Sequence, residues 1–165
     1  MSLTLYDVSV PVFVKNLKSL SKLLAKGQAH FEKDESKIIH ARLVDDMGDL
    51  IFQIQRVADT AKGLAVRVGG AEDVTLEDNE TDFAGIYKRI NRVIEILESL
   101  PSTCTDGKED AEIVMKAGGH ELKFTGKQYV LDFAIPNFFF HVVTAYNILR
   151  KEGVAVGKGD FLGRT

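Results

Sequence analysis

The sequence has little of several features that would assign a cellular setting or a chemistry directly. It contains a single cysteine, Cys104, so no disulfide can form within the chain. No stretch reaches the roughly 18 apolar residues that suggest a membrane-spanning helix. The first residues lack the basic and apolar regions of a secretory signal. We therefore expect a cytoplasmic protein without a membrane partner, in which Cys104 is a bystander thiol in a polar loop.

Neither sign of charge is in strong excess, and no block of like charges occurs. Charged residues make up 27% of the 165 residues, and the formal net charge is −3. A nucleic-acid-binding surface needs a clustered basic excess, so we expect no nucleic-acid partner. The apolar content of 45% is ordinary for a globular protein, and the length fits a single domain over residues 1–165.

Four long segments carry apolar residues at intervals of three and four, which is the spacing of amphipathic helices. They predict helices near residues 5–26, 46–68, 81–99 and 126–152. Pro11 is expected near the start of the first helix, and Asp45, Asp46 and Asp49 at the start of the second. Thr125-Gly-Lys-Gln128 matches a capping box that opens the fourth helix. The polar segment after the first helix is expected to be a turn or a short helix.

The pattern changes between the third and fourth helices. Residues 112–116 and 120–124 alternate apolar and polar side chains around Gly118-Gly119, which is typical of a small β-hairpin. The combination favours an all-α four-helix bundle with this β-hairpin between helices 3 and 4. The fourth helix is apolar almost all round and needs cover on more than one face. Either it lies centrally in the bundle or it packs against a second subunit, and we expect a homodimer.

One ionisable side chain interrupts this apolar helix. His141 follows Phe138–Phe140, so its imidazole is expected to be partly buried and to need a partner, a ligand or a metal. Gln55 and Asp59 share one face of the second helix and are candidate partners, as is Tyr146 further along the fourth helix. Three roles stay open for His141: a hydrogen-bonded core residue, a general base or substrate-binding group, and a metal ligand.

Motifs in the second helix, the fourth helix and the tail form a set. They are Asp45-Asp46-Met47, Phe52-Gln53-Ile54-Gln55, Asp59-Thr60-Ala61-Lys62-Gly63, residues 136–146 with 148–150, and residues 153–154 with 157–163. Together they resemble the DinB/YfiT-like superfamily of four-helix bundles, and more closely a subgroup filed as a domain of unknown function. The resemblance spans nearly the whole chain and implies the same bundle fold.

The resemblance also implies a metal site, from which this chain departs. Members of the wider superfamily often hold a divalent metal with three histidines, one on the second helix and two on the fourth, four residues apart. Some of them transfer low-molecular-weight thiols. Here Asn137 stands four residues before His141 and Ala145 four after it, and no histidine lies between Ala41 and Gly119. We therefore expect no metal and no cofactor.

Three functions follow as hypotheses. The first is small-molecule binding by a dimeric bundle, in a pocket formed by His141, Tyr146, Gln55, Asp59 and Asn137. The second is an enzyme of the DinB-like type, either a metal-dependent thiol transferase or a metal-free acid–base catalyst that uses His141. The third is an interaction module that dimerises through its helices.

Overall fold

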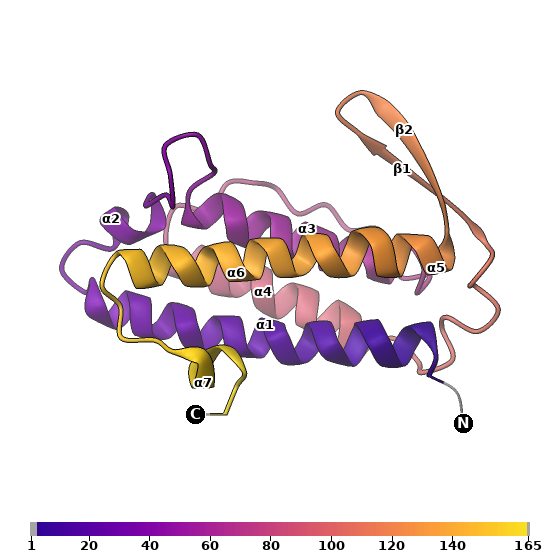
Figure 1. The fold of residues 1–165 in the computed structure, drawn as a ribbon, viewed down its shortest axis with the longest axis horizontal. Helices are drawn as coiled ribbons and strands as arrows, with labels where there is room; N and C mark the ends of the chain where they lie inside the picture. Colours follow the sequence, from indigo (N-terminus) through magenta and orange to yellow (C-terminus); the bar gives the residue numbers. More distant parts are fainter. Residues whose placement is uncertain (1–2, 165) are drawn as a thin grey trace.

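The structure, a computed structural model, describes residues 3–164, and its four long helices form a bundle (Figure 1). These helices are α1 (Leu5–His30), α3 (Leu50–Arg67), α4 (Phe83–Glu98) and α6 (Ile135–Lys151). Helix α3 packs against α6 and α4, and α1 packs against the other sides of α4 and α6. The predicted all-α bundle is thereby confirmed.

The core lies between these helices and is filled by aliphatic and aromatic side chains. Phe13 of α1 and Phe138 of α6 are fully buried, and their rings stack with centroids 4.0 Å apart and planes within 7°. Such an aromatic pair adds about 0.5–1.5 kcal/mol beyond the area that it buries. The stacked rings thus join the first and last long helices of the chain.

Helix α1 begins at the predicted residue and ends later than the sequence predicted. It begins at Leu5, where Thr4 and Asp7 form a capping box. Pro11 therefore lies inside the helix and not at its start, so the Asp7 carbonyl loses its usual amide donor. Pro11 is exposed, and water can reach that carbonyl. At the other end α1 continues to His30 before the short helix α2 (Glu35–Ile39).

Helix α3 begins at Leu50, which is later than the predicted start at residue 46. Asp49 is the N-cap residue, and its side chain accepts a hydrogen bond from the Phe52 amide at 3.0 Å. Asp45 and Asp46 therefore lie in the preceding loop and not in the first turn of the helix. An N-cap that satisfies a free amide is worth about 1 kcal/mol, which is why Asp49 sets the boundary.

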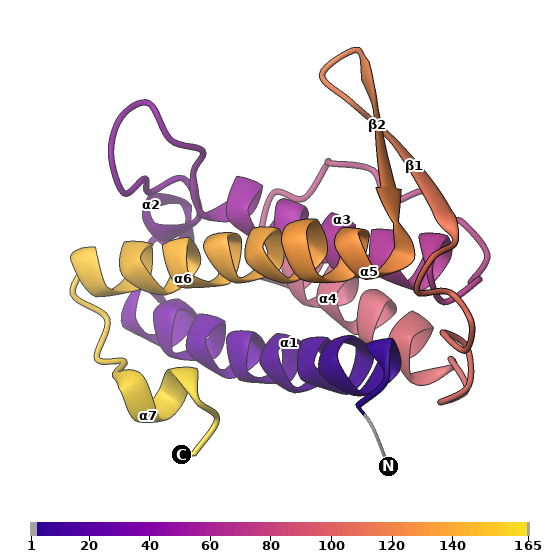
Figure 2. The same ribbon diagram turned by 45° about the vertical axis from the view of Figure 1, so that its right-hand side comes forward.

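The predicted hairpin is present and stands out from one end of the bundle, as Figures 1 and 2 show. Strands β1 (Glu112–Ala117) and β2 (His120–Thr125) are antiparallel, and Ala117 pairs with His120. Gly118 and Gly119 have φ values of 57° and 79°. Two successive positive φ values are what a two-residue type I′ turn requires, and glycine adopts them without strain.

The predicted fourth helix consists of three consecutive parts. The capping box of Thr125 and Gln128 opens α5 (Gly126–Gln128), the π-helix η1 (Tyr129–Ala134) follows, and α6 continues from it. Pro136 has no amide hydrogen to close an α-turn with the carbonyl four residues earlier, and the wider π turns lie immediately before it.

The tail contains a short helix, α7 (Lys158–Phe161), although its several glycines favour irregular structure. This helix packs against α1, and Lys26 of α1 pairs with Asp160 at 2.5 Å. The end of the chain therefore lies along the first helix. Among residues 3–164, no helix has the length and apolar character needed to cross a bilayer.

Candidate functional site

Polar side chains meet in pairs along the contact between α3 and the fourth-helix segment. We call this row the polar seam, and it consists of three hydrogen-bonded pairs: Gln53 with His141 (2.7 Å), Thr60 with Asn137 (2.7 Å), and Arg67 with Tyr129 (3.2 Å). The three α3 members are seven residues apart, so they share one face of the helix. The seam thus runs along most of α3.

Gln53 determines the tautomer of His141. The side chain of Gln53 is buried, and its amide nitrogen donates to the Gly48 carbonyl at 2.8 Å. Its oxygen Oε1 is therefore the atom 2.7 Å from His141 Nδ1, and an oxygen can only accept. His141 Nδ1 must carry the proton. The lone pair of the neutral imidazole is then on Nε2.

The surroundings of His141 keep its imidazole uncharged. Burial, together with the positive charge of nearby Arg56, lowers the pKa of His141 from 6.5 to about 4. The rings of Phe140 and Phe52 lie edge-on to the imidazole, at centroid distances of 5.1 Å and 6.3 Å. The Arg56 guanidinium in turn lies 5.2 Å from the centroid of the Phe52 ring. At neutral pH His141 is therefore a neutral hydrogen-bond acceptor beside two aromatic rings.

The second ring nitrogen of His141 is not used within the protein. Of the hydrogen bonds within residues 3–164, the imidazole makes the one to Gln53 through Nδ1, and Nε2 makes none. A neutral imidazole with one nitrogen held by the protein is the arrangement in which histidine accepts a hydrogen bond from a ligand. Because its pKa is about 4, His141 is a weak base at neutral pH. Acceptance of a hydrogen bond thus suits it better than removal of a proton.

Gln55 and Asp59 were predicted to face His141, but they belong to a different network. Asp59 pairs with Arg89 of α4, whose side chain is 2% exposed, and Gln55 joins the same network through Glu80. Arg89 donates to Asp59 at 2.8 Å and to Glu80 at 2.8 Å, and Gln55 donates to Glu80 at 2.9 Å. Neither Gln55 nor Asp59 hydrogen-bonds to His141, so the predicted pocket is not assembled from these residues.

This second network, the Arg89 cluster, consists of Arg89 with Asp59, Asp78 and Glu80. Burial by itself lowers the pKa of Arg89, but the hydrogen bond to Glu80 and the charges of Asp59 and Glu80 raise it overall. Asp78 and Glu80 lie in the connection from α3 to α4, residues 68–82. The cluster therefore holds this connection against α3 and α4, which is a structural role.

The remaining two predicted site residues separate as well. Asn137 lies on the polar seam one turn before His141, and its amide donates to Thr60. Tyr146 packs its ring against Phe161 of α7, with centroids 5.7 Å apart, and has no hydrogen bond to His141. Of the five predicted residues, the structure places only His141 and Asn137 on one site.

The sequence interpretation missed Gln53 as the partner of His141. Gln53 and Gln55 stand in the same helical motif, and Gln55 is the predicted partner because it flanks the apolar stripe. The available signal was the seven-residue spacing of Gln53, Thr60 and Arg67, which marks a single polar line on a mostly apolar helix. A buried glutamine needs partners for both ends of its amide, and Gly48 with His141 supplies them.

The residues around His141 do not fit the three-histidine metal site of the wider superfamily. Gln53 faces His141 from α3, and Ala145 is buried one turn after it. The other histidines lie elsewhere: His30 is exposed at the end of α1, His40 pairs with Asp49 at 3.2 Å, and His120 is exposed on the hairpin. Across residues 3–164, no three histidine, cysteine or carboxylate side chains converge as metal ligands.

Comparison with known proteins identifies the family of this chain. No curated protein matches the sequence. A crystal structure of a DinB family member protein from Shewanella denitrificans is similar, with a TM-score of 0.85 and 38% sequence identity over 96% of this chain and 92% of that chain. The model of the family described as a domain of unknown function, DUF1993, matches residues 5–162. The chain therefore belongs to this family and is a DinB-like domain.

Proposed function

We propose that the protein binds a small molecule at the His141 end of the polar seam. The observation that carries this proposal is the buried Gln53, which holds His141 Nδ1 and leaves the lone pair of Nε2 available. Binding sites in proteins typically combine apolar walls with a few fixed polar groups. Phe52 and Phe140 supply the apolar part here, and both are partly exposed, at 41% and 57%.

The chemistry of the site favours a ligand with a hydrogen-bond donor and an apolar body. A neutral acceptor nitrogen pairs with a hydroxyl, thiol or amide hydrogen, and not with a carboxylate. The two phenylalanine rings favour an aromatic or aliphatic body. A phenol or an aromatic thiol combines both properties.

The test is a fragment screen followed by nuclear magnetic resonance on protein labelled with ¹⁵N. The ring nitrogens of His141 are expected to report the Nδ1–H tautomer at pH 7. Phenols and aromatic thiols should shift the Nε2 resonance more than matched benzoates do. A His141 imidazole in the Nε2–H tautomer, or one that no donor-bearing fragment perturbs, contradicts the proposal.

The matched variants are His141→Phe and His120→Phe. The first removes the acceptor, so fragment binding is expected to fall by about fivefold or more, since a hydrogen bond is worth roughly 1 kcal/mol or more. The second removes an exposed histidine on the hairpin and should leave binding unchanged. Equal losses in both variants would indicate binding that is not specific to the site.

We also propose that the outward stripe of α6 is a homodimer interface. Phe140 and Val143 are 57% and 41% exposed. They stand three residues apart, so they are neighbours on one face of α6 and form a short apolar strip. Since Phe140 borders His141, a second copy on this strip would help to enclose the binding site.

Sedimentation velocity measures this association. Wild-type protein is expected to dimerise at micromolar concentration, and Phe140→Ser with Val143→Ser should shift it to monomer. Val114→Ser is the control, because Val114 is 40% exposed but lies on the hairpin. A monomer at all concentrations, or a dimer that survives the double substitution, contradicts this interface.

A further inference from the structure

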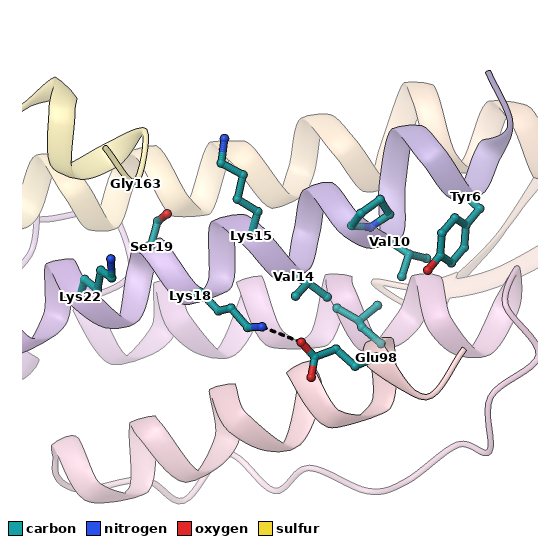
Figure 3. Close-up of a pocket in the computed structure, with 11 residues that line it drawn as sticks. Tyr6, Val10, Val14, Lys15, Lys18, Ser19, Lys22, Glu98 and Gly163 are labelled. Atoms are coloured by element: carbon teal, nitrogen blue, oxygen red, sulfur yellow. Dashed lines mark hydrogen bonds and ion pairs between the residues drawn. The ribbon is translucent and has the colours of Figure 1, made fainter. Parts of the chain in front are cut away.

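A separate hollow lies between α1 and α4, with the tail at one end. Its volume is about 510 Å³, within the range of roughly 300–1,000 Å³ of small-molecule sites. None of its lining residues belongs to α3 or α6, so it is distinct from the His141 site. We call it the α1–α4 groove, and Figure 3 shows its residues.

The groove has an apolar end. Tyr6, Val10 and Val14 of α1 line it together with Leu97 of α4. Val10 and Leu97 are 3% and 0% exposed, so this end is a recessed wall and not a protruding patch. A hydrocarbon chain in the groove would cover the accessible parts of Tyr6 and Val14, which are half-buried, and that burial is favourable.

The other end is basic. Lys15, Lys18 and Lys22 of α1 also line the groove, and Figure 3 shows Lys18 directed towards Glu98 and Lys15 directed the opposite way. Glu98 pairs with Lys18 at 2.6 Å and is the one acidic residue in the lining. Lys15 has no carboxylate partner within residues 3–164, so its charge is not neutralised by a neighbouring side chain. An anion in the groove would pair with this charge.

A buried hydroxyl lies at this basic end. Ser19 is 6% exposed and lines the groove, and its hydroxyl makes no hydrogen bond within residues 3–164. Gly163 of the tail lies against it, and a Cβ at that position would be 2.6 Å from Ser19 Oγ. Gly163 has a φ of +67°, so glycine suits the position for its backbone as well. Glycine therefore lets the tail pack closely against this hydroxyl, whose hydrogen has no acceptor within residues 3–164.

We propose that the α1–α4 groove binds a free carboxylate with a hydrocarbon chain. The carboxylate would accept hydrogen bonds from Ser19 and from the lysines, which are charge-assisted bonds. The chain would follow α1 towards Val14, Val10 and Tyr6. The occupant is a dissolved molecule and not a bilayer, because Val10 and Leu97 are recessed and α1 carries no exposed large apolar side chain.

Isothermal titration with decanoate below its micelle concentration tests the proposal, and decanol is the neutral control. Decanoate is expected to bind about tenfold more tightly than decanol, because only decanoate uses the basic end. Amide resonances of Val10 and Val14 should shift, and that of His141 should not. Equal affinity for decanol, or no measurable decanoate binding at millimolar concentration, overturns the proposal.

Substitutions at the basic end test which side chains hold the carboxylate. Lys15→Gln with Lys18→Gln is expected to weaken decanoate binding by about tenfold, and Ser19→Ala by several-fold. Lys37→Gln on α2 is the control, since its side chain is 71% exposed and lies outside the groove. Far-ultraviolet circular dichroism checks that the variants fold. Decanoate affinity that is unchanged in the double lysine variant overturns the proposal.

His141→Phe distinguishes the groove from the His141 site. It should leave decanoate binding unchanged. Loss of decanoate binding in that variant would show that the carboxylate binds at the His141 site, and this result would overturn the proposal. Binding to anionic vesicles without binding to monomeric decanoate would also overturn it, because the occupant would then be a bilayer.

Discussion

At His141 the properties of one side chain depend on a second side chain that carries no charge. The bond from Nδ1 to Gln53 at 2.7 Å orients the imidazole, and the Gly48 carbonyl orients Gln53 in turn. The state of the histidine is therefore set by two neutral partners, while Arg56 and burial oppose its protonation. This arrangement has consequences for stability that can be measured.

The first prediction concerns pH. The pKa of His141 is about 4 in the folded protein and 6.5 as the ordinary value, so the unfolded chain binds the proton more readily. The stabilisation is complete above pH 6.5 and is lost as the pH falls towards 4. The expected loss attributable to His141 is on the order of 2–3 kcal/mol. Urea unfolding between pH 7 and pH 4 measures it.

His141→Gln is the comparison for that experiment. Glutamine keeps an amide donor for Gln53 but does not titrate, so its unfolding free energy should decline less steeply over the same interval. The difference between the two curves isolates the histidine from the carboxylates, which titrate in both proteins. Parallel curves would show that His141 has an ordinary pKa.

The second prediction concerns the Gln53–His141 pair. His141→Phe leaves the buried Gln53 oxygen without a partner, and an unsatisfied buried polar group costs about 1–3 kcal/mol. In the double variant Gln53→Leu with His141→Phe no unpaired group remains at this contact, so it should recover much of that loss. A double-mutant cycle from chemical denaturation gives the coupling energy. Additive losses would mean that the two residues do not interact.

At the scale of elements, the Arg89 cluster holds the connection between α3 and α4. The third prediction is that Arg89→Met destabilises the protein by about 2–4 kcal/mol, because the carboxylates lose a buried partner. The loss of stability should be smaller than for breaking a fully buried ion pair, because Asp59 and Asp78 are 36% and 44% exposed. Thermal and urea unfolding measure the change.

Arg92→Met on the same helix is the matched control. Its side chain is 51% exposed and pairs with Glu95 at 3.3 Å, so its removal should change stability by less than about 0.5 kcal/mol. If both substitutions cost the same, the burial of Arg89 contributes nothing specific. Amide exchange in residues 68–82 should also rise in Arg89→Met alone.

The elements themselves were largely predictable from local patterns. Apolar periodicity located the four long helices, and the glycine pair located the hairpin, because both signals depend on residues close in sequence. The later start of α3 at Leu50 was not predicted, since the choice among three aspartates as N-cap depends on geometry. The short helix α7 packs on α1, a contact between distant segments that no local pattern contains.

The site was less predictable than the fold. His141 and Asn137 could be named from the sequence because they are one helical turn apart on the same segment. The side chain opposite them depends on how α3 is rotated against α6, and this rotation directs Gln53 to His141 and Gln55 to Glu80. A shift of two residues along a helix changes the facing direction by about 200°, so the choice between Gln53 and Gln55 needed tertiary information.

At the scale of the whole molecule, the hairpin is the part least joined to the rest. Residues 116–121 are all exposed, and in both views the tip extends away from the helices. The fourth prediction is that replacing residues 116–121 by Asn-Gly lowers the melting temperature by less than about 4 °C. A change of 1 kcal/mol corresponds to about 2–4 °C at this chain length. Calorimetry measures it, and a much larger drop would mean that the tip supports the bundle.

Helix α3 carries two polar networks on different sides, and this constrains how the sequence can change over time. Gln53, Thr60 and Arg67 serve the seam, whereas Gln55 and Asp59 serve the Arg89 cluster. In diverging members of the family, positions 53 and 141 should then vary together, and positions 59 and 89 should vary together. Substitutions at positions 53 and 141 should not correlate with substitutions at positions 59 and 89, so the two faces of α3 should evolve independently.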